Sequence, residues 1–402
     1  MQARRTTAAY AAALFAILLG AYLLIYTGIP DSADGDALLA VSASLLRTGN
    51  PNIHAVAYAD MLFPVDSARM GTFGADGALY SKKGITPSLG LLPFVLAADL
   101  LTFLSTRTAA MLFNPVVTAA TALVLFAFLR RLNYARWVAF AAGLIYGLAT
   151  LAFPYARTLY GEPLAALLLL IAVYGLYEYW QRGRWNWLTV LATAISLLVG
   201  VNTIYVLPAG LLGLLAFIEA MRQRKWRHVL ALTAPVFMLA AAFGLYNAVR
   251  FGSPFTTGYR FSDGEGFSFP FMTGVFGLTL SPYRGLFWYS PVLLLALPGW
   301  LTLRRQTSRL AWLILALVML QLVMFASWWS WDGGVTWGPR FMLPAIPLMM
   351  LALAPLIVEA VKRWWLALIL IGFVALSFYI QLLGALFDHL TYLSYQVNAL
   401  WG

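Results

Sequence analysis

Long apolar runs, separated by short polar turns, recur along almost the whole chain. A helix needs about twenty apolar residues to cross a bilayer, so a window of about nineteen residues detects candidate spans. Eleven runs meet this criterion, near residues 9–28, 111–129, 137–153, 162–180, 187–201, 203–220, 228–248, 286–303, 310–327, 341–360 and 364–386. The pattern predicts an all-α polytopic membrane protein with about eleven transmembrane helices, within a range of roughly ten to thirteen.

The composition supports the same class of protein. The 402 residues are 62% hydrophobic and only 10% charged, and the mean hydropathy is +0.81. A soluble domain could not bury this much apolar surface, so lipid is the expected solvent. No stretch between the apolar runs is large enough for a separate soluble domain, and we expect one transmembrane domain over residues 1–402.

The basic residues predict the orientation. With the N-terminus in the cytoplasm, the inner turns contain sixteen of the 26 Lys and Arg residues and only three of the 15 acidic residues. Cytoplasmic loops are expected to carry this excess. The net charge of +11 therefore reflects topology, and nucleic acid is not an expected partner. We expect a bacterial inner (plasma) membrane protein whose outer face is periplasmic or extracellular; in a eukaryote that face would be lumenal.

One apolar run, residues 89–104, does not fit the alternation. Counting it as a span would move Arg130 and Arg131 outside and would invert every later loop. The run is also short, and it contains Pro93 and Asp99. We therefore expect a helix that lies on the outer leaflet or dips into it.

Polar chemistry is concentrated in the outer segments, which cover residues 29–110, 249–285 and 328–340, with a shorter one near 154–161. The inner loops contain only a few residues each. Loops on a rigid scaffold commonly carry binding and catalytic residues. The function is therefore expected at the non-cytoplasmic face.

The first outer segment opens with Asp31, Asp34 and Asp36, ahead of a helical pattern from Ala37 to Leu46. One interpretation is that Asp36 caps this helix. The other is that one carboxylate is a general base at the membrane surface, where partial burial would tune its pKa. The motif by itself leaves both interpretations open.

The same segment continues with GADGALYSKKG, which places Lys82 and Lys83 in a glycine-rich turn before the interfacial helix. Lysines at this depth commonly extend to the membrane surface and contact the phosphates of any nearby lipid, without selecting one. The alternative is capture of one specific lipid phosphate, in a pocket shaped by Tyr80 and the preceding glycines.

The short outer motif PYARTLYGEP contains Arg157 and Glu162. A glutamate followed by Pro163 is an ordinary start for a helix. An acidic group at the rim of a span is nevertheless a functional candidate.

Two aromatic outer motifs follow. SPYRGLFWYSP contains Tyr283 and Arg284, and WWSWDGGVTWGPRF contains Trp331, Asp332 and Arg340. Tryptophan is expected at a membrane interface. The two glycines after Asp332 and the later GPR indicate tight turns that an interfacial anchor does not need.

In this order, the motifs resemble those of the GT-C-fold glycosyltransferases that use polyprenyl-phosphate sugars, the superfamily of protein O-mannosyltransferases and aminoarabinose transferases. The resemblance covers nearly the whole chain and rests on the Asp34–Gly35–Asp36 motif and the segments YSKKG, YARTLYGEP, SPYRGLFWYSP and WWSWDGGVTWGPRFMLPAIP. It implies a GT-C-like fold and an inverting hexosyl- or pentosyltransferase of the cell envelope. Such an enzyme moves a sugar from a polyprenyl-monophosphate donor to a glycan, lipid or protein acceptor on the non-cytoplasmic side.

The resemblance also implies residue roles. Asp34 and Asp36 compete for the base that deprotonates the acceptor, and Asp36 is favoured because it directly precedes the helical run. Lys82 or Lys83 would bind the donor phosphate, and Glu162 matches a second acidic position that orients the acceptor or a metal. Further candidates are Arg284 and Arg340 for the phosphate, and Tyr80, Arg157, Tyr283, Trp331 and Asp332 for the acceptor or sugar. Many family members add a soluble outer domain, whereas only a short tail follows the last run here, so we expect acceptor recognition in the loops or in a partner.

No motif requires a cofactor, although the outer carboxylates leave open a divalent cation bound through oxygen ligands. The absence of cysteine and the separation of the three histidines argue against a thiolate or histidine-rich site. The main alternative function is a polytopic transporter or lipid-linked-sugar flippase, which predicts ionisable residues near mid-membrane and paired discontinuous helices. A catalytically silent GT-C relative, which would be expected to lose the acidic motif, and a polymerase or ligase are the others.

Overall fold

The structure is a computed structural model that describes residues 2–29, 32–54, 71–101, 103–259 and 264–387. Asp31 and His389 lie outside the described residues. The chain divides into two compact units, each assembled from separate stretches. The first unit contains Met1–Tyr26, Pro115–Arg157 and Gly264–Gly402, and the second contains Thr27–Asn114 and Thr158–Asp263. The expectation of one transmembrane domain stays a prediction.

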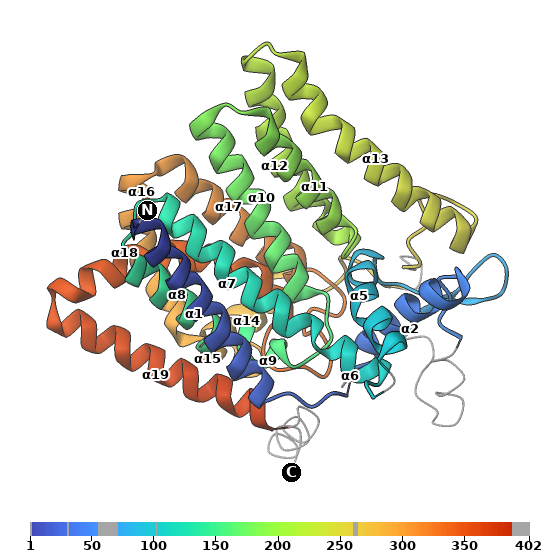
Figure 1. Ribbon diagram of the computed structural model, residues 1–402, viewed down its shortest axis with the longest axis horizontal. Coiled ribbons are helices and arrows are strands. Elements are labelled where there is room, and N and C mark those ends of the chain that lie inside the picture. The colour runs from blue at the N-terminus through green and yellow to red at the C-terminus, as the bar shows by residue number, and fades with distance from the viewer. Residues whose placement is uncertain (1, 30–31, 55–70, 102, 260–263, 388–402) are drawn as a thin grey trace. The chain divides into compact units, whose positions relative to one another are not determined.

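The first unit is organised around α18 (Ile346–Lys362), which contacts α8, α16, α17 and α19. The span Arg340–Lys362 includes α18, and 89% of its most apolar 18-residue stretch is buried inside the protein. A helix that is apolar on all sides is expected at the centre of a bundle. The other helices of this unit are α1 (Gln2–Leu24), α7 (Phe113–Arg131, from Pro115 onward), α8 (Arg136–Leu148), α9 (Ala152–Ala156), α14 (Phe271–Thr279), α15 (Leu286–Tyr289), η3 (Pro291–Leu295), α16 (Ala296–Gln306), α17 (Ser308–Ala326), η4 (Arg340–Ala345) and α19 (Trp364–Leu386) (Figure 1).

The run at 286–303, expected as one span, is interrupted. It forms α15, η3 and α16, with Ser290 at φ −133° and ψ 68° between the first two. Two side chains of α19 form hydrogen bonds with the backbone groups at this break. Gln381 donates to the carbonyl of Tyr289, and Ser377 accepts from the amide of Val292 at 2.8 Å. Irregular backbone in a membrane protein needs such partners, because lipid offers none.

The second unit contains four consecutive helices that pack against one another. They are α10 (Glu162–Arg182), α11 (Trp185–Val199), α12 (Val206–Arg222) and α13 (Trp226–Phe251), and η1 (Thr203–Tyr205) leads into α12. Contacts join α10 to α11, and α11 to both α12 and α13. Short turns make neighbours antiparallel, so the α10–α11 and α12–α13 turns share one end and the α11–α12 turn lies at the other (Figure 1).

The first outer segment belongs to the second unit. It forms α2 (Ala33–Thr48), α5 (Thr86–Leu100) and α6 (Thr106–Met111), and α5 packs against both other helices. The helix expected at 89–104 is therefore present as α5, with Pro93 inside it.

A short hairpin precedes α5 and was not expected. Strand β1 (Gly71–Phe73) pairs antiparallel with β2 (Leu79–Ser81). The connecting turn contains Asp76 and Gly77, and Gly77 adopts φ +79°, which glycine accommodates without steric cost. Three-residue strands are too short to show an alternating pattern.

The helices confirm an all-α polytopic membrane protein. All eleven predicted runs overlap helices. Within the part of the chain that the structure describes, eight helical segments are long and apolar enough to cross a bilayer. These are Arg5–Leu24, Thr106–Arg131, Glu162–Arg182, Thr203–Arg222, Trp226–Phe251, Ser308–Ala326, Arg340–Lys362 and Trp364–Leu386. Of the remaining three runs, two correspond to the shorter α8 and α11, and the third is the interrupted one.

Candidate active site

The acidic motif forms the first turn of α2. Ser32 is the N-cap, and its hydroxyl accepts from the amide of Gly35 at 3.1 Å. The capping role considered for Asp36 is therefore wrong, because Asp34 and Asp36 are the second and fourth residues of the helix. Carboxylates in a first turn are stabilised by the helix dipole.

Asp34 is ion-paired with Lys83. The Asp34 Oδ2 and Lys83 Nζ atoms are 3.0 Å apart, and the side chains are 20% and 25% exposed. A pair with this much exposure contributes about 1 kcal/mol or less, because water screens it and ordering two side chains costs entropy. A competing anion with two or more charged oxygens could displace the carboxylate from the lysine at small cost.

The KKG turn is fixed onto the connection between α11 and η1. The amide of Gly84 donates to the carbonyl of Val201 at 3.2 Å, and that of Thr86 donates to Gly200 at 2.9 Å. A Cβ on Gly84 would lie 2.1 Å from the Gly200 carbonyl oxygen, so only glycine permits this approach. The motif search did not identify residues 200–202 as neighbours of the lysine turn. Gly200 was the only feature of the sequence that pointed to a close backbone contact there.

The two acidic motifs also meet in this unit. A Cβ on Gly35 would lie 2.8 Å from the carbonyl oxygen of Leu159, so the acidic turn of α2 packs directly on the loop that leads into α10. Glu162, the first residue of α10, follows three positions later. The same loop meets the other turns at Gly161, where a Cβ would contact Val201 at 3.0 Å and Pro87 at 3.4 Å. Three motifs that are distant in sequence thus converge.

Asn114 holds the loop before Glu162. Its side-chain amide donates to the carbonyls of Thr158 at 2.7 Å and Tyr160 at 3.0 Å, and its side chain is fully buried. Removing a buried donor would leave two carbonyls unsatisfied, each at a cost of about 1–3 kcal/mol. Asn114 is therefore a positioning residue that the motif search did not identify.

Tyr80 belongs to the hairpin core. Its hydroxyl donates to Asp76 Oδ2 at 2.8 Å, and only 1% of the residue is exposed. Burial and the neighbouring carboxylate raise the pKa of Tyr80 to about 12. Hydrogen bonds from the Ala78 amide and from Tyr80 lower the pKa of Asp76. Tyr80 thus supports the strand that ends at the lysine turn, where Arg250 of α13 also donates to the Ser81 carbonyl at 2.6 Å.

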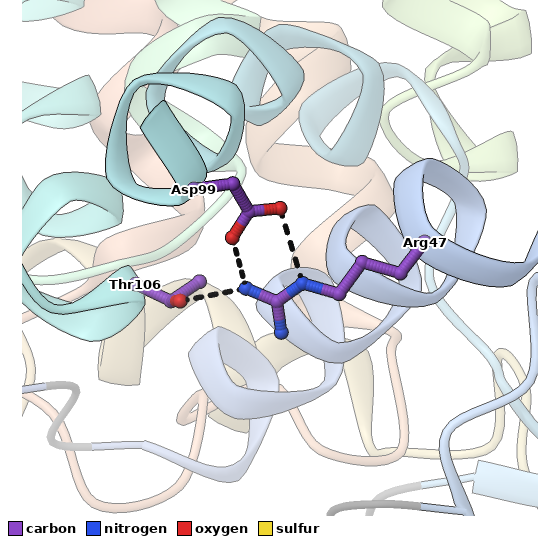
Figure 2. Close-up of polar contacts among 3 residues, drawn as sticks. All are labelled: Arg47, Asp99 and Thr106. Atoms are coloured by element: carbon purple, nitrogen blue, oxygen red, sulfur yellow. Dashed lines mark hydrogen bonds and ion pairs between the residues drawn. The ribbon is translucent and has the colours of Figure 1, made fainter. Parts of the chain in front are cut away.

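A second ionic contact joins α2 to the helices after the hairpin. Figure 2 shows Arg47 of α2 with Asp99 of α5 and Thr106 of α6. Arg47 donates through Nη2 and Nε to the two oxygens of Asp99 at 2.5 and 3.2 Å, and through Nη2 to Thr106 Oγ1 at 2.8 Å. This bidentate contact lowers the pKa of Asp99. It fixes the C-terminal end of α2, whose N-terminal end carries Asp34 and Asp36.

The aromatic motifs lie in the first unit, where Arg284 is fully buried. Its guanidinium donates to the carbonyl of Thr336 and to that of Gly334 at 2.6 Å, and it stacks on Tyr283 at 4.6 Å from the ring centroid. These bonds tie Arg284 to the backbone of the WDGGVTWGPR loop. The arrangement stabilises that loop.

The rest of this loop packs on itself. Arg340 is 7% exposed, and its side chain covers Gly333, which has φ +76°. Asp332 Oδ1 accepts from the amide of Gly334 at 3.2 Å, so it closes a local turn. Trp331 packs against Tyr283 with ring centroids 6.4 Å apart. The tight turns predicted from the glycines are present.

Arg157 belongs to the first unit, although it precedes Glu162 by only five residues. It is 9% exposed, and its guanidinium donates to the carbonyl of Ala385 at the end of α19. The twelve predicted site residues therefore separate into two sets. The second unit holds Asp34, Asp36, Tyr80, Lys82, Lys83 and Glu162, and the first holds Arg157, Tyr283, Arg284, Trp331, Asp332 and Arg340. Among the described residues, no three acidic or histidine side chains form a group that could hold a metal ion.

A comparison with solved structures supports the fold. No protein-family model matches the sequence, and no curated protein matches it. An oligosaccharyltransferase from Archaeoglobus fulgidus is structurally similar, with a TM-score of 0.51, 11% identity, and coverage of 94% of this chain and 56% of that one. The arabinosyltransferase EmbB from Mycobacterium smegmatis gives a TM-score of 0.49 and 16% identity over 85% of this chain and 30% of that one.

The likeness to the oligosaccharyltransferase defines the class of fold, and it confirms the GT-C fold that the motifs implied. The chain spans just over half the length of that oligosaccharyltransferase, at 56%.

Proposed function

We propose that this protein is an inverting glycosyltransferase that moves a sugar from a polyprenyl-monophosphate donor to an acceptor on the non-cytoplasmic side of the membrane. The proposal rests on the Asp34–Lys83 pair at the point where the three motifs of the second unit converge. The similarity in fold to an oligosaccharyltransferase supports glycosyl transfer as the reaction class.

Lys83 is the proposed ligand of the donor phosphate, and Lys82 is its neighbour in the same turn. The donor phosphate is a diester whose single negative charge is shared by two oxygens, so it can replace the Asp34 carboxylate on the ammonium group as an equivalent acceptor. Both lysines are partly exposed at the start of α5, where a lipid-linked phosphate at the membrane surface would arrive. Their charge would stabilise the negative charge that develops on the phosphate as the sugar leaves.

Asp36 is the proposed base. Successive residues of a helix project about 100° apart, so Asp34 and Asp36 point to opposite sides of the Gly35–Leu159 contact. Inversion requires the base and the leaving group on opposite faces of the sugar, several ångströms apart. A carboxylate already bound to the phosphate-binding lysine is on the leaving-group side, so Asp34 would hold Lys83 in place until the phosphate binds, and Asp36 would accept the proton.

The reaction balances as a single displacement. The acceptor oxygen bonds to the anomeric carbon while the bond from that carbon to the phosphate oxygen breaks. Its electron pair remains on the phosphate, near Lys83, and the acceptor proton moves to Asp36. Glu162 would orient the acceptor.

The charge distribution of the second unit supports the proposed side. The acidic and lysine motifs contact the end of the four helices where Glu162 and Val201 lie. The basic turns with Arg182 and Arg222 lie at the opposite end. Because cytoplasmic turns carry the excess of basic residues, the candidate site is proposed to be non-cytoplasmic.

The test is sugar transfer, or donor hydrolysis, from a panel of synthetic polyprenyl-phosphate sugars by purified protein in lipid. Asp34→Asn, Asp36→Asn and Lys83→Ala would be compared with the wild type. Glu359→Gln is the control, since Glu359 pairs with Lys362 at the end of α18 in the first unit. We expect one donor to turn over, Asp36→Asn to lower turnover by about 10²–10⁴-fold, and the control to behave as wild type. If no donor turned over and none bound, the transferase would be rejected and a transporter would be the next hypothesis.

A further inference from the structure

A groove separate from the candidate active site lies at the opposite end of the second unit. It has a volume of about 570 Å³ and lies where α12 turns into α13. Ala220 and Met221 of α12, and Val229 and Leu230 of α13, supply its apolar wall. The turn between the helices adds Arg224, Lys225 and Trp226.

The polar end of this groove is strongly basic. Arg222, Arg224, Lys225 and Arg227 fall within six consecutive residues, and all four are exposed. Glu219 is the nearest acidic residue in the sequence, and it lies 4.0 Å from Arg222. The turn is therefore positively charged, and it favours an anionic ligand.

The apolar wall is open to the membrane environment. In α13, only 6% of the most apolar 18-residue stretch is buried inside the protein. Met221, Trp226 and Leu230 are 52%, 69% and 51% exposed. An apolar helix that packs so little on its own protein presents its surface to lipid chains. Trp226 stands at the boundary between this apolar surface and the basic turn, the position that tryptophan favours at a membrane interface.

The backbone of the turn gives an independent indication. Arg224 adopts φ +51°, a left-handed conformation that is costly for a residue with a side chain. The α10–α11 turn at the same end of the unit uses Gly183 at φ +60° for this purpose. Glycine would therefore fit the geometry of the α12–α13 turn better than arginine. The presence of an arginine indicates that its side chain has a role other than shaping the turn.

We propose that this groove binds an anionic phospholipid. The phosphate lies against Arg224 and Lys225, the Trp226 ring lies at headgroup depth, and an acyl chain follows Val229 and Leu230. Lipid binding at this groove involves α12 and α13 alone and does not depend on the transferase reaction. It differs from donor capture, because the acidic and lysine motifs lie at the other end of the helices.

Native mass spectrometry and thermal unfolding in lipid nanodiscs test the proposal on the full chain. One arm uses phosphatidylglycerol, a second uses phosphatidylcholine, and a third adds inorganic phosphate or glycerol phosphate without acyl chains. Arg224→Gly removes the charge at a position where glycine relieves backbone strain, so folding should be preserved. Arg184→Ala is the matched control, because Arg184 is an exposed basic residue at the neighbouring turn and is followed by the exposed Trp185.

We expect wild type and Arg184→Ala to retain phosphatidylglycerol and to be stabilised by it in preference to phosphatidylcholine. Arg224→Gly should lose about fivefold in affinity for phosphatidylglycerol, and the double variant with Lys225→Ala roughly 25-fold. Equal retention by all variants, or equal loss in Arg184→Ala, would overturn the proposal. So would stabilisation by free phosphate alone. A change from dimer to monomer without any lipid dependence would assign the groove to a second copy of the chain instead.

Discussion

The two units use their candidate charged residues differently. In the second unit Asp34 and Lys83 bind each other while remaining 20% and 25% exposed. In the first unit Arg284 and Arg157 are 0% and 9% exposed, and their guanidinium groups donate to backbone carbonyls. Both sets look alike in the sequence, since each consists of charges among aromatic and glycine residues of outer segments.

Asp34 and Lys83 can exchange their partner for another ion, whereas the buried guanidinium groups of Arg284 and Arg157 are held by backbone carbonyls. A partly exposed ion pair contributes little net free energy, so a substrate ion can take the place of one partner. A buried guanidinium that satisfies carbonyl groups cannot leave without exposing them, and breaking such an arrangement costs several kcal/mol. We therefore propose that the chemistry belongs to the second unit and that the buried arginines of the first unit stabilise its loops.

The largest effect is expected at Asp36. Asp36→Asn removes the proposed base but keeps the size of the side chain, so transfer should fall by about 10²–10⁴-fold. Donor affinity should stay within about twofold, because the phosphate contacts are made by the lysines. Initial rates and donor binding by the same protein preparation check this. Asp34→Asn removes the carboxylate that competes with the phosphate for Lys83, so we expect donor binding to be kept or strengthened and the chemical step to slow far less than in Asp36→Asn.

The next effect is on stability and concerns the first unit. Arg284→Met leaves the carbonyls of Gly334 and Thr336 without their donor, and we expect a loss of about 2–4 kcal/mol. Thermal unfolding in a fixed lipid would measure it, with the exposed Arg305→Met as the control. The molecules that remain folded should bind donor as the wild type does. A loss of donor binding with unchanged stability would instead make Arg284 a phosphate ligand.

A smaller effect is expected at Lys83. Lys83→Ala removes one partly exposed charge, so donor affinity should fall by about tenfold, which corresponds to about 1.4 kcal/mol. Lys83→Arg should recover most of this affinity, and added salt should reduce the difference between wild type and Lys83→Ala. Titration of a donor analogue at two salt concentrations would check both. An affinity that is independent of Lys83 and of salt would contradict phosphate binding at this turn.

The smallest effect concerns the exposed Arg47–Asp99 pair, whose side chains are 46% and 33% exposed. Arg47 lowers the pKa of Asp99 in the folded protein. Its contribution to stability is therefore present above the ordinary carboxyl pKa and disappears as the pH falls through the lowered value. We expect Asp99→Asn to lower the unfolding temperature slightly at neutral pH, and by progressively less as the pH falls below the ordinary carboxyl pKa. A difference that grows on acidification would contradict this assignment.

Much of the fold could be predicted from hydrophobicity, because lipid exposure requires long apolar helices. The break between Tyr289 and Pro291 could not, since the side chains that satisfy it, Ser377 and Gln381, lie about ninety residues away in the sequence. The hairpin before α5 was missed for a different reason: its strands have three residues each, which is too short to show the alternation of apolar and polar residues that marks a strand.

The sequence indicated which residues to consider for the candidate site, but not which of them lie together in the fold. Asp34, Lys83 and Glu162 stood out by charge at the ends of apolar runs. Their convergence depends on backbone approaches at Gly35 and Gly84, which the sequence marks only as glycines. The buried roles of Arg157 and Arg284 were hidden, because a sequence does not show whether a guanidinium faces a substrate or a carbonyl.

Photo-crosslinking tests the central comparison most directly. A polyprenyl-phosphate sugar with a diazirine beside the phosphate would be bound to the wild-type protein in lipid, and the labelled peptides would be identified by mass spectrometry. The account predicts labelling of the segments around Asp34–Asp36 and Lys82–Gly84 in the second unit, and loss of that labelling in Lys83→Ala. Labelling confined to residues 331–340 of the first unit, and insensitive to Lys83, would contradict it.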